Sequence, residues 1–286
     1  MPTIAVIGNC QAQAIEAIIA MHTDCKILRL PPVFEMSDAD KDRTLDVLGK
    51  VDVIFAQRVS ADYNPPFLRA ASLRSMFPNV LIWPNIYHAG YSPDIEYLYL
   101  GGIGKVVGPL DDYHMKTVRT AYLRGASVAE CLSCYSVENF TSIFPNPIEA
   151  SLAELRRREK DVDIKISDCI EEYGKGRKLF YTPNHPVNVL LFEMVRRMLY
   201  GIGLNFDNPP SHPYTLSKIN VPVYSAVRRH YGLDNLAEGS FVGIDRLDYT
   251  NSSDTSSTRV YEDLEDLVNV FYRFYDTVPG FRELQA

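Results

Sequence analysis

The segment Thr3-Ile-Ala-Val-Ile-Gly-Asn-Cys-Gln-Ala-Gln-Ala14 passes from one apolar pattern to another within a few residues. Thr3–Ile7 is a short, mostly β-branched apolar run that ends at Gly8, as is typical of a strand buried on both faces of a parallel sheet. Gln11–Met21 then consists of helix formers with apolar side chains at helical spacing. The segment therefore predicts a strand, a tight turn and a helix, which together begin a parallel βαβ unit.

The same alternation continues to about residue 83. The expected elements are strands over Lys26–Leu30, Val51–Ala56 and Asn79–Trp83, a helix that starts at Ser37, and a helix over Pro66–Met76. This order implies a mostly parallel sheet with right-handed connections and helices on its faces. Ligands of such sheets bind at the carboxyl ends of the strands.

The second part of the chain has a different pattern. A Gly-rich bend over residues 101–109 is followed by helical patterns from about His114 to Lys160. We expect a short strand at Lys178–Tyr181, helices over Pro186–Tyr200 and Arg259–Asp276, and a polar loop at Asn251–Ser257. No Pro/Gly/Ser linker divides the chain. The predicted fold class is α/β, with one integrated domain over 1–286: a sheet-forming half (1–110) and a mainly helical half (111–286).

Composition narrows the function. The chain has 286 residues, 46% hydrophobic and 23% charged, with a net charge of −7 that argues against a general nucleic-acid binder. Its five cysteines are an odd number without the pattern of a secreted disulfide framework, which indicates a reducing compartment. The beginning of the sequence has no basic segment followed by a long apolar run, and no stretch is apolar enough to span a membrane. We therefore expect a cytoplasmic protein.

The turn Gly8-Asn-Cys-Gln11 places a thiol at a helix N-terminus. It lacks the Gly spacing of the dinucleotide fingerprint and the Gly-Lys-Ser/Thr of a phosphate loop. The helix dipole and the free amides of the first turn stabilise a thiolate and lower its pKa. With the side chains of Asn9 and Gln11, the same amides are suited to holding an oxyanion. Cys10 is thus a candidate nucleophile, and the alternative is a small cysteine packed at a tight turn.

The segment Thr182-Pro-Asn-His-Pro186 supplies a candidate base. His185 precedes a proline that is expected to begin a helix, and a positive helix end disfavours imidazolium. A neutral His185 is then available to take a proton, and Cys10 with His185 would form a nucleophile–base pair. In the alternative reading His185 only caps its helix.

Further polar residues follow the predicted strands. Gln57 and Arg58 come after the third strand, and Asn85, His88 and Tyr91 come after the fourth. By topology they should line the same crevice as Cys10. His114, which follows the Gly-rich bend, is a further candidate for orienting the base or contacting substrate.

Other motifs are given structural interpretations. Cys131 and Cys134 have redox or zinc spacing without a second pair, so we expect two helix residues. The basic run Arg156–Lys160 predicts a solvated helix face, with phosphate binding as the alternative. No motif supports a metal site, and the missing Gly-x-Ser-x-Gly argues against an ordinary α/β-hydrolase.

The chain resembles the WcbI family of polysaccharide biosynthesis proteins over nearly its whole length. Ile7-Gly-Asn-Cys-Gln-Ala12 looks like the opening motif of that family. Looser similarities follow in order at Gln57, Trp83-Pro-Asn85, Gly90-Tyr-x-Pro93, Asp112-Tyr-His114 and Thr182-Pro-Asn-His-Pro186.

The resemblance implies binding of coenzyme A or acetyl-coenzyme A and O-acetylation of a sugar or glycan in capsular or exopolysaccharide assembly. The residues expected to bind the coenzyme are then Gly8, Gln57, Arg58, Asn85, His88, Tyr91 and His114. The layout is also similar to that of the Ser-Gly-Asn-His hydrolases, with Cys10 in the position of the serine and His185 in that of the histidine. A thiol esterase and a non-catalytic carbohydrate- or coenzyme A-binding protein stay open as alternatives.

Overall fold

The structure, a computed structural model, divides into two compact units, each assembled from three separate segments. It describes residues 1–207, 209, 213, 215–233, 235–236, 239–249 and 257–284. Unit 1 comprises Met1–Tyr87, Leu152–Gly174 and Asn184–Leu216, and unit 2 comprises His88–Ser151, Lys175–Pro183 and Ser217–Ala286. The expected boundary at residue 110 falls inside unit 2. That the chain folds as one integrated domain stays a prediction.

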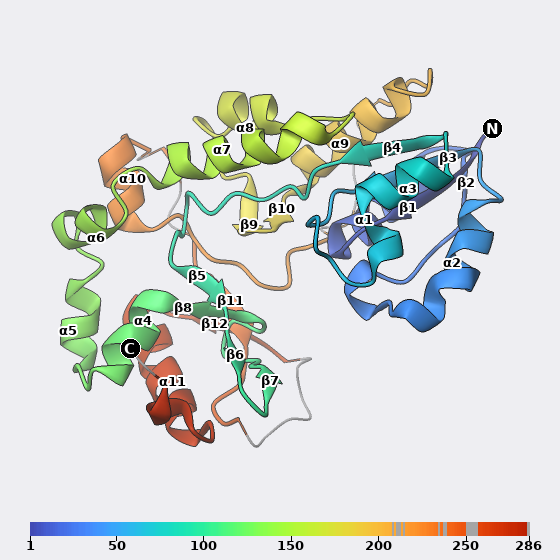
Figure 1. Cartoon of the computed structure of the whole chain (residues 1–286). Coiled ribbons are helices and arrows are strands. Elements are labelled where there is room, and N and C mark those ends of the chain that lie inside the picture. Colours follow the sequence, from blue (N-terminus) through green and yellow to red (C-terminus); the bar gives the residue numbers. More distant parts are fainter. Residues whose placement is uncertain are drawn as a thin grey trace. The chain divides into compact units, whose positions relative to one another are not determined.

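Unit 1 is built on the parallel sheet that the sequence predicts. Four strands pair in the order β2-β1-β3-β4, all parallel (Figure 1). Their bounds are β1 Thr3–Ile7, β2 Lys26–Ile27, β3 Val53–Gln57 and β4 Val80–Trp83. The α/β fold class is therefore confirmed. The strands end where polar residues begin, so their carboxyl ends gather the candidate residues at one edge of the sheet.

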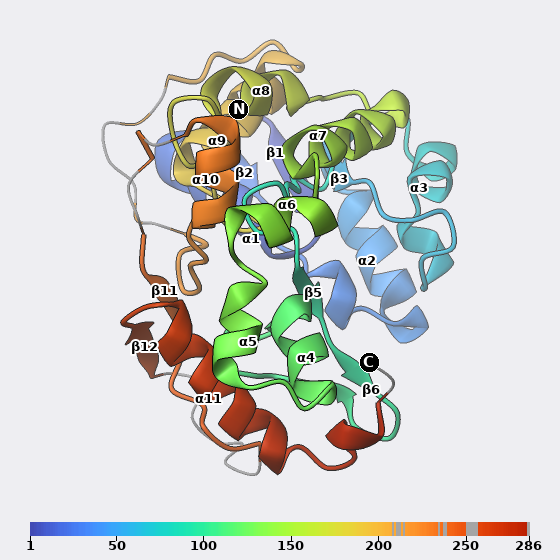
Figure 2. The same ribbon diagram turned by 90° about the vertical axis from the view of Figure 1, so that its left-hand side faces the viewer.

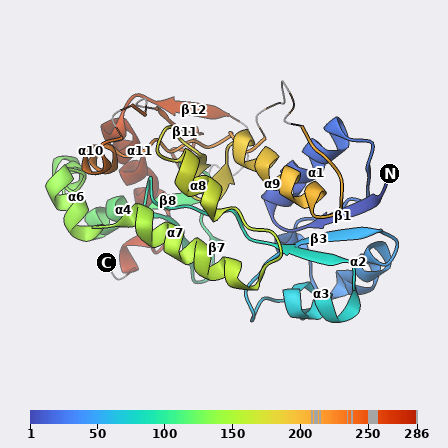
Figure 3. The ribbon, with the colours of Figure 1, turned by 90° about the horizontal axis from the view of Figure 1, so that it is seen from above.

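Helices cover both faces of this sheet. The helices that lie wholly in unit 1 are α1 Cys10–His22, α2 Lys41–Leu48, α3 Ala70–Met76, α8 Ser167–Tyr173 and α9 Asn188–Tyr200, with the single turns η1 Val33–Glu35, η2 Asp38–Asp40, η3 Pro66–Leu68 and η4 Glu159–Asp161. Figure 3 shows α1 and α9 on one side of the strands and α2 and α3 on the other. Ala5 and Ile7 of β1 belong to the same buried cluster as Leu48 of α2 and Leu73 of α3. Burial on both faces explains why the first strand is apolar at successive positions.

Unit 2 combines short antiparallel strand pairs with helices. The pairs are β5 Ile95–Tyr97 with β8 Tyr113–Met115, β6 Tyr99–Leu100 with β7 Gly104–Lys105, and β11 Phe241–Ile244 with β12 Thr258–Tyr261. The other elements are β9 Phe180–Thr182, α4 Lys116–Leu123, α5 Val128–Ser133, α6 Val137–Ile143, α10 Ser225–Tyr231, α11 Leu264–Thr277 and η5 Phe281–Glu283. Helices α4, α5 and α11 pack side by side (Figure 2). Helix α7 Pro147–Arg158 starts in unit 2 and ends in unit 1.

Several predicted boundaries need correction. The expected closing helix Arg259–Asp276 starts only at Leu264, because Thr258–Tyr261 pairs as strand β12 and the side chain of Asp263 caps the helix. The helix expected from Pro186 starts at Asn188, after strand β10 His185–Pro186. Residues 251–256 of the predicted polar loop lie outside the described residues. Within the described part of the chain, no helix has both the length and the apolar character needed to cross a membrane.

Candidate active site

The turn between β1 and α1 has the geometry that its sequence predicts. Asn9 is the N-cap of α1, and its Oδ1 accepts a hydrogen bond from the backbone N–H of Gln11 at 3.0 Å. Gly8 allows β3 to approach closely, since a Cβ at this position would lie 2.8 Å from the Cβ of Gln57. Cys10 is the first residue of α1 and is partly exposed. Its thiol therefore lies at the N-terminus of a long helix, where the backbone amides of the first turn are directed outward.

Gln57, at the end of β3, ties this turn to the sheet. Its Oε1 accepts a hydrogen bond from the backbone N–H of Asn9 at 3.0 Å. Its Nε2 donates to Asn9 Oδ1 at 3.2 Å and to Gln11 Oε1 at 3.1 Å. Asn9 Nδ2 in turn donates to Oδ1 of Asn85, which follows β4, at 3.4 Å. The ends of three parallel strands are thus joined by a network of side-chain amides.

Gln11 has a different place from the one expected. Its side chain is fully buried, and Nε2 donates to the carbonyl oxygens of Ile86 (2.8 Å) and Asn184 (2.6 Å). Its Oε1 accepts from the backbone N–H of Ile86 at 3.0 Å, besides the bond from Gln57. Both amide hydrogens are therefore engaged, and the side chain has no donor left for an oxyanion. The contacts of Gln11 are those of a residue that holds other segments in position.

The bond from Gln11 brings together the segments of the two catalytic candidates. Gln11 is the chain neighbour of Cys10, and Asn184 is the chain neighbour of His185. All four residues belong to unit 1, although more than 170 positions separate the two pairs in sequence. Cys10 and His185 are both partly exposed. His185 lies in β10 itself and α9 starts only at Asn188, so the expected position of His185 directly before its helix is wrong.

A pocket of about 470 Å³ opens beside this network in unit 1. It is lined by four of the predicted residues: Asn9, Gln57, Arg58 and Asn85. It is also lined by Phe34 of η1, which is 63% exposed, by Tyr63, and by Glu154, Arg157 and Arg158 near the end of α7. The volume lies within the usual range for small-molecule sites.

The arginines of α7 give the pocket a positive charge. Their place at this pocket was not predicted from the sequence. Arg157 and Arg158 donate hydrogen bonds to the carboxylate of Glu154, and these bonds lower the pKa of Glu154 to about 2. With Arg58, the part of the lining that the structure describes carries three guanidinium groups and one carboxylate. The basic run Arg156–Lys160 is the sequence feature that could have indicated these arginines, since phosphate binding was its alternative interpretation. The side chains of Arg156 and Arg157 are 49% and 61% exposed, as a solvated face predicts, and Arg157 also lines the pocket together with Arg158.

Three other predicted residues are buried in unit 2. His88 is 2% exposed, and burial lowers its pKa to about 4. His114 is fully buried between Tyr275 Oη (3.1 Å from Nδ1) and the carbonyl oxygen of Val106 (3.0 Å from Nε2). Tyr91 packs its ring edge-on against His88. These contacts are those of core residues, and the described lining of the unit 1 pocket does not include them. Their role in coenzyme binding stays a prediction.

The motifs with structural interpretations lie in helices. Cys131 is fully buried in α5, and burial raises its thiol pKa to about 12, while Cys134 is the C-cap of that helix. Cys10 is thus the cysteine of the sequence that begins a helix at the sheet edge. Among the residues described, no cluster of three His, Cys, Asp or Glu side chains is arranged to hold a metal ion.

Comparisons with known proteins agree with this architecture. The family model described as polysaccharide biosynthesis enzyme WcbI matches residues 3–207. A solved structure of WcbI superimposes with a TM-score of 0.75 at 21% sequence identity, covering 99% of this chain and 92% of that one. That structure is described as a novel polysaccharide biosynthesis enzyme, in a native form without a disulfide bond between coenzyme A and one of its cysteines.

Among curated proteins, no sequence matches the chain. The solved structure shares the fold, and the family model covers well over half of the sequence. The resemblance noted from Gly8-Asn-Cys-Gln11 is confirmed: the chain belongs to the WcbI family of polysaccharide biosynthesis enzymes.

Proposed function

We propose that this protein transfers an acetyl group from acetyl-coenzyme A to a sugar hydroxyl during polysaccharide biosynthesis. One observation carries the proposal: the bond from Gln11 to Asn184 joins the chain neighbours of a thiol and an imidazole, beside a basic pocket. A nucleophile, a base and a positively charged binding surface are the parts that acyl transfer from an anionic donor requires.

The pocket suits the phosphates of coenzyme A. Arg58, Arg157 and Arg158 give it a local excess of positive charge in a chain of net charge −7. A guanidinium has five N–H donors, so Arg157 can bind Glu154 and still offer donors to a phosphate. The description of the solved WcbI structure mentions coenzyme A and a cysteine, in a form without a disulfide bond between them, and this mention of coenzyme A supports the same ligand here.

His185 would begin the reaction by accepting the thiol proton of Cys10. The Cys10 sulfur then bonds to the acetyl carbonyl carbon, and Asn9 Nδ2 with the positive end of the α1 dipole stabilises the oxyanion. His185 returns the proton to the departing coenzyme sulfur as its bond to the acetyl carbon breaks. In the second half His185 accepts the proton of the sugar hydroxyl, and the hydroxyl oxygen bonds to the acetyl carbon to form the ester. The bond from that carbon to the Cys10 sulfur breaks, and His185 returns the proton to this sulfur.

A direct route needs only the second proton transfer. His185 takes the proton of the sugar hydroxyl, and the hydroxyl oxygen bonds to the acetyl carbon without an intermediate on Cys10. The coenzyme sulfur leaves and takes up the proton. The two routes differ in whether the protein carries an acetyl group after it meets the donor alone.

Intact-protein mass spectrometry after mixing with acetyl-coenzyme A tests the covalent route, and calorimetric titration with coenzyme A tests donor binding. We expect coenzyme A to bind wild type and Cys10→Ala alike, and the acetyl adduct to form on wild type and be absent from Cys10→Ala. Cys134→Ala, which changes the C-cap of α5 in unit 2, is the matched control and should keep the adduct. Lack of coenzyme A binding at millimolar concentration would overturn the proposal. Binding without an adduct would select the direct route.

A further inference from the structure

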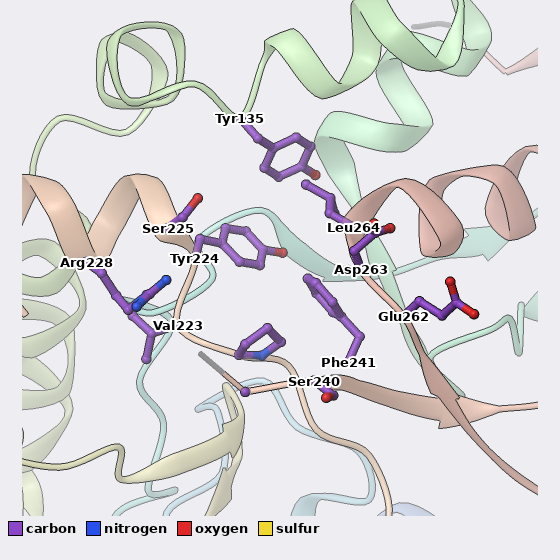
Figure 4. A pocket seen from close by; sticks show the side chains of 12 residues that line it. Tyr135, Val223, Tyr224, Ser225, Arg228, Ser240, Phe241, Glu262, Asp263 and Leu264 are labelled. Atoms are coloured by element: carbon purple, nitrogen blue, oxygen red, sulfur yellow. The ribbon is translucent and has the colours of Figure 1, made fainter. Parts of the chain in front are cut away.

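Unit 2 contains a second pocket, of about 380 Å³. Its wall is formed by side chains from four separate segments of that unit: Tyr135, Tyr224, Phe241 and Leu264. Figure 4 shows these side chains gathered around the pocket, with Arg228 and Ser225 on one side and Glu262 on the other. The proposed acetyl transfer assigns no role to this pocket.

A buried carboxylate fixes the aromatic wall. Asp94 is 1% exposed and accepts hydrogen bonds from Tyr135 Oη and Tyr224 Oη, each at 2.7 Å. Burying a carboxylate is unfavourable unless its oxygens are hydrogen bonded, and here both are. The two rings meet edge to face with centroids 5.6 Å apart. The wall is therefore held in one geometry before any ligand arrives, which reduces the entropy lost on binding.

The rim is polar, and its residues are exposed except for Arg228, which is partly buried. It carries the hydroxyls of Ser225 and Ser240, the guanidinium of Arg228, and the carboxylates of Glu262 and Asp263. Among the described residues, this lining has two carboxylates and one guanidinium, whereas the unit 1 pocket has three guanidinium groups and one carboxylate. This charge disfavours anions such as phosphates and uronic acids, and the carboxylates are strong acceptors for hydroxyl donors.

We propose that the unit 2 pocket binds a neutral sugar residue of a glycan. A sugar ring combines C–H surfaces, which pack against aromatic and aliphatic side chains, with hydroxyls that donate to carboxylates and serine oxygens. The wall of Tyr135, Tyr224, Phe241 and Leu264 and the rim of Glu262, Asp263, Ser225 and Ser240 supply both kinds of contact. The chain belongs to a family of polysaccharide biosynthesis enzymes, and sugar residues are ligands that fit this role. The inference goes beyond the proposed acetyl transfer and does not depend on it.

Saturation-transfer NMR with the full-length protein tests this site. The probes are the methyl glycosides of glucose, galactose and mannose at millimolar concentration, each alone, with the corresponding glucuronide and galacturonide as charged counterparts. We expect transfer to the ring protons of at least one neutral glycoside and weaker transfer to its uronide. Ser240→Trp, which fills the exposed rim, should reduce the signal by about fivefold or more. Arg196→Ala, at an arginine of α9 in unit 1 outside the described linings of both pockets, is the control and should leave it unchanged.

A second variant keeps the test decisive if Ser240→Trp does not fold. Glu262→Gln preserves the size of an exposed side chain and removes one negative charge. It should reduce the saturation transfer to the neutral glycoside severalfold. The difference in transfer between the neutral glycoside and its uronide should become smaller. Three results would each overturn the proposal: no transfer to any neutral glycoside, stronger transfer to uronides in wild type, or unchanged signals in the folded variants.

Discussion

The side-chain amides of unit 1 and the imidazoles of unit 2 were all predicted to belong to one site, yet they have different surroundings in the structure. Gln57 and Asn85 follow β3 and β4 and join a network around the start of α1. His88 and His114 lie in the core of unit 2. In unit 1 the strands are parallel, so their carboxyl ends meet at one edge. In unit 2 the strands are short antiparallel pairs, and His114 lies within one of them.

The difference teaches that a polar residue marks the site only when it lies close to the end of a parallel strand. Asn85, two positions after β4, joins the network, whereas His88, five positions after the same strand, is buried in unit 2. His114 shows the other outcome: its two ring nitrogens are satisfied inside the core, and Gly108 leaves room for the ring, since a Cβ there would lie 2.8 Å from its Cε1. Four experiments can break or sharpen this contrast between a chemical site in unit 1 and a packing role in unit 2.

The largest effect is expected at His185. His185→Ala should lower the rate of acetyl transfer by about 10²–10⁴-fold, because the base that accepts the proton is lost. Its folding should change little, since the side chain is partly exposed. The comparison requires transfer kinetics and a denaturation curve on the same variant. A folded variant with the wild-type rate would remove His185 from the proposed site.

His114→Ala should have a large effect on stability. It deletes a fully buried ring and two hydrogen bonds, so the free energy of unfolding should fall by about 3 kcal/mol. His230→Ala, on the exposed side of α10, should change it by less than about 0.5 kcal/mol. Urea unfolding gives both values. The contrast fails if His114→Ala keeps wild-type stability and loses coenzyme A binding.

Buried ionisable groups in the two units should respond oppositely to pH. In unit 1, burial raises the pKa of Glu16 from 4.5 to about 7, so its contribution to stability falls as pH rises through that window. In unit 2, burial lowers the pKa values of His88 and His114 from 6.5 to about 4, so their contributions fall as pH decreases through that range.

Glu16→Gln isolates the unit 1 part. Oε1 of Glu16 has no hydrogen-bond partner among the described residues, so a neutral amide should stabilise the protein by about 2–3 kcal/mol above pH 7 and have little effect below pH 4.5. Exposed Glu35 supplies the control, Glu35→Gln. The measurement is the urea midpoint of unfolding as a function of pH. If Glu16→Gln has the same midpoints as wild type at every pH, burial of the Glu16 carboxylate does not destabilise the protein.

The smallest effect concerns the pocket arginines. Arg58→Ala and Arg157→Ala should each weaken coenzyme A binding by about 5–30-fold at low salt, because each removes a charge-assisted donor. Arg196→Ala removes an arginine of α9 that pairs with Glu193 away from that lining, and should leave the affinity unchanged. Calorimetry at two salt concentrations separates the three variants. If all variants bind coenzyme A with the affinity of wild type, its phosphates do not bind in this pocket.

Local elements were the most predictable part of the fold. The strand Thr3–Ile7 was predicted with its observed bounds, and the adjacent helix differs by one residue at each end. Both follow from the spacing of apolar side chains, which a sequence displays directly. The strands of unit 2 were largely missed, and β12 was read as the start of a helix. Strands of two to four residues have too few positions to show an alternation, and they exist because a distant partner pairs with them.

The candidate site divides in the same way. Asn9 and Cys10 at a helix start could be predicted, since the N-cap and the turn are local. Arg157 and Arg158 were interpreted as a solvated face, because nothing in a basic run states which pocket it borders. The buried bonds of Gln11 depend on the carbonyls of Ile86 and Asn184, which a sequence does not reveal.

The sequence by itself determined the parallel sheet, the thiol at the first helix and the family, because these rest on periodicity, capping and one short motif. Tertiary structure decided which polar residues meet. It joined the chain neighbours of Cys10 and His185 through one amide, placed the α7 arginines beside Asn9, and enclosed His114 in a core. The physical reason is that hydrogen bonds and charge pairs act over a few ångströms, so their partners are fixed only when distant segments pack together.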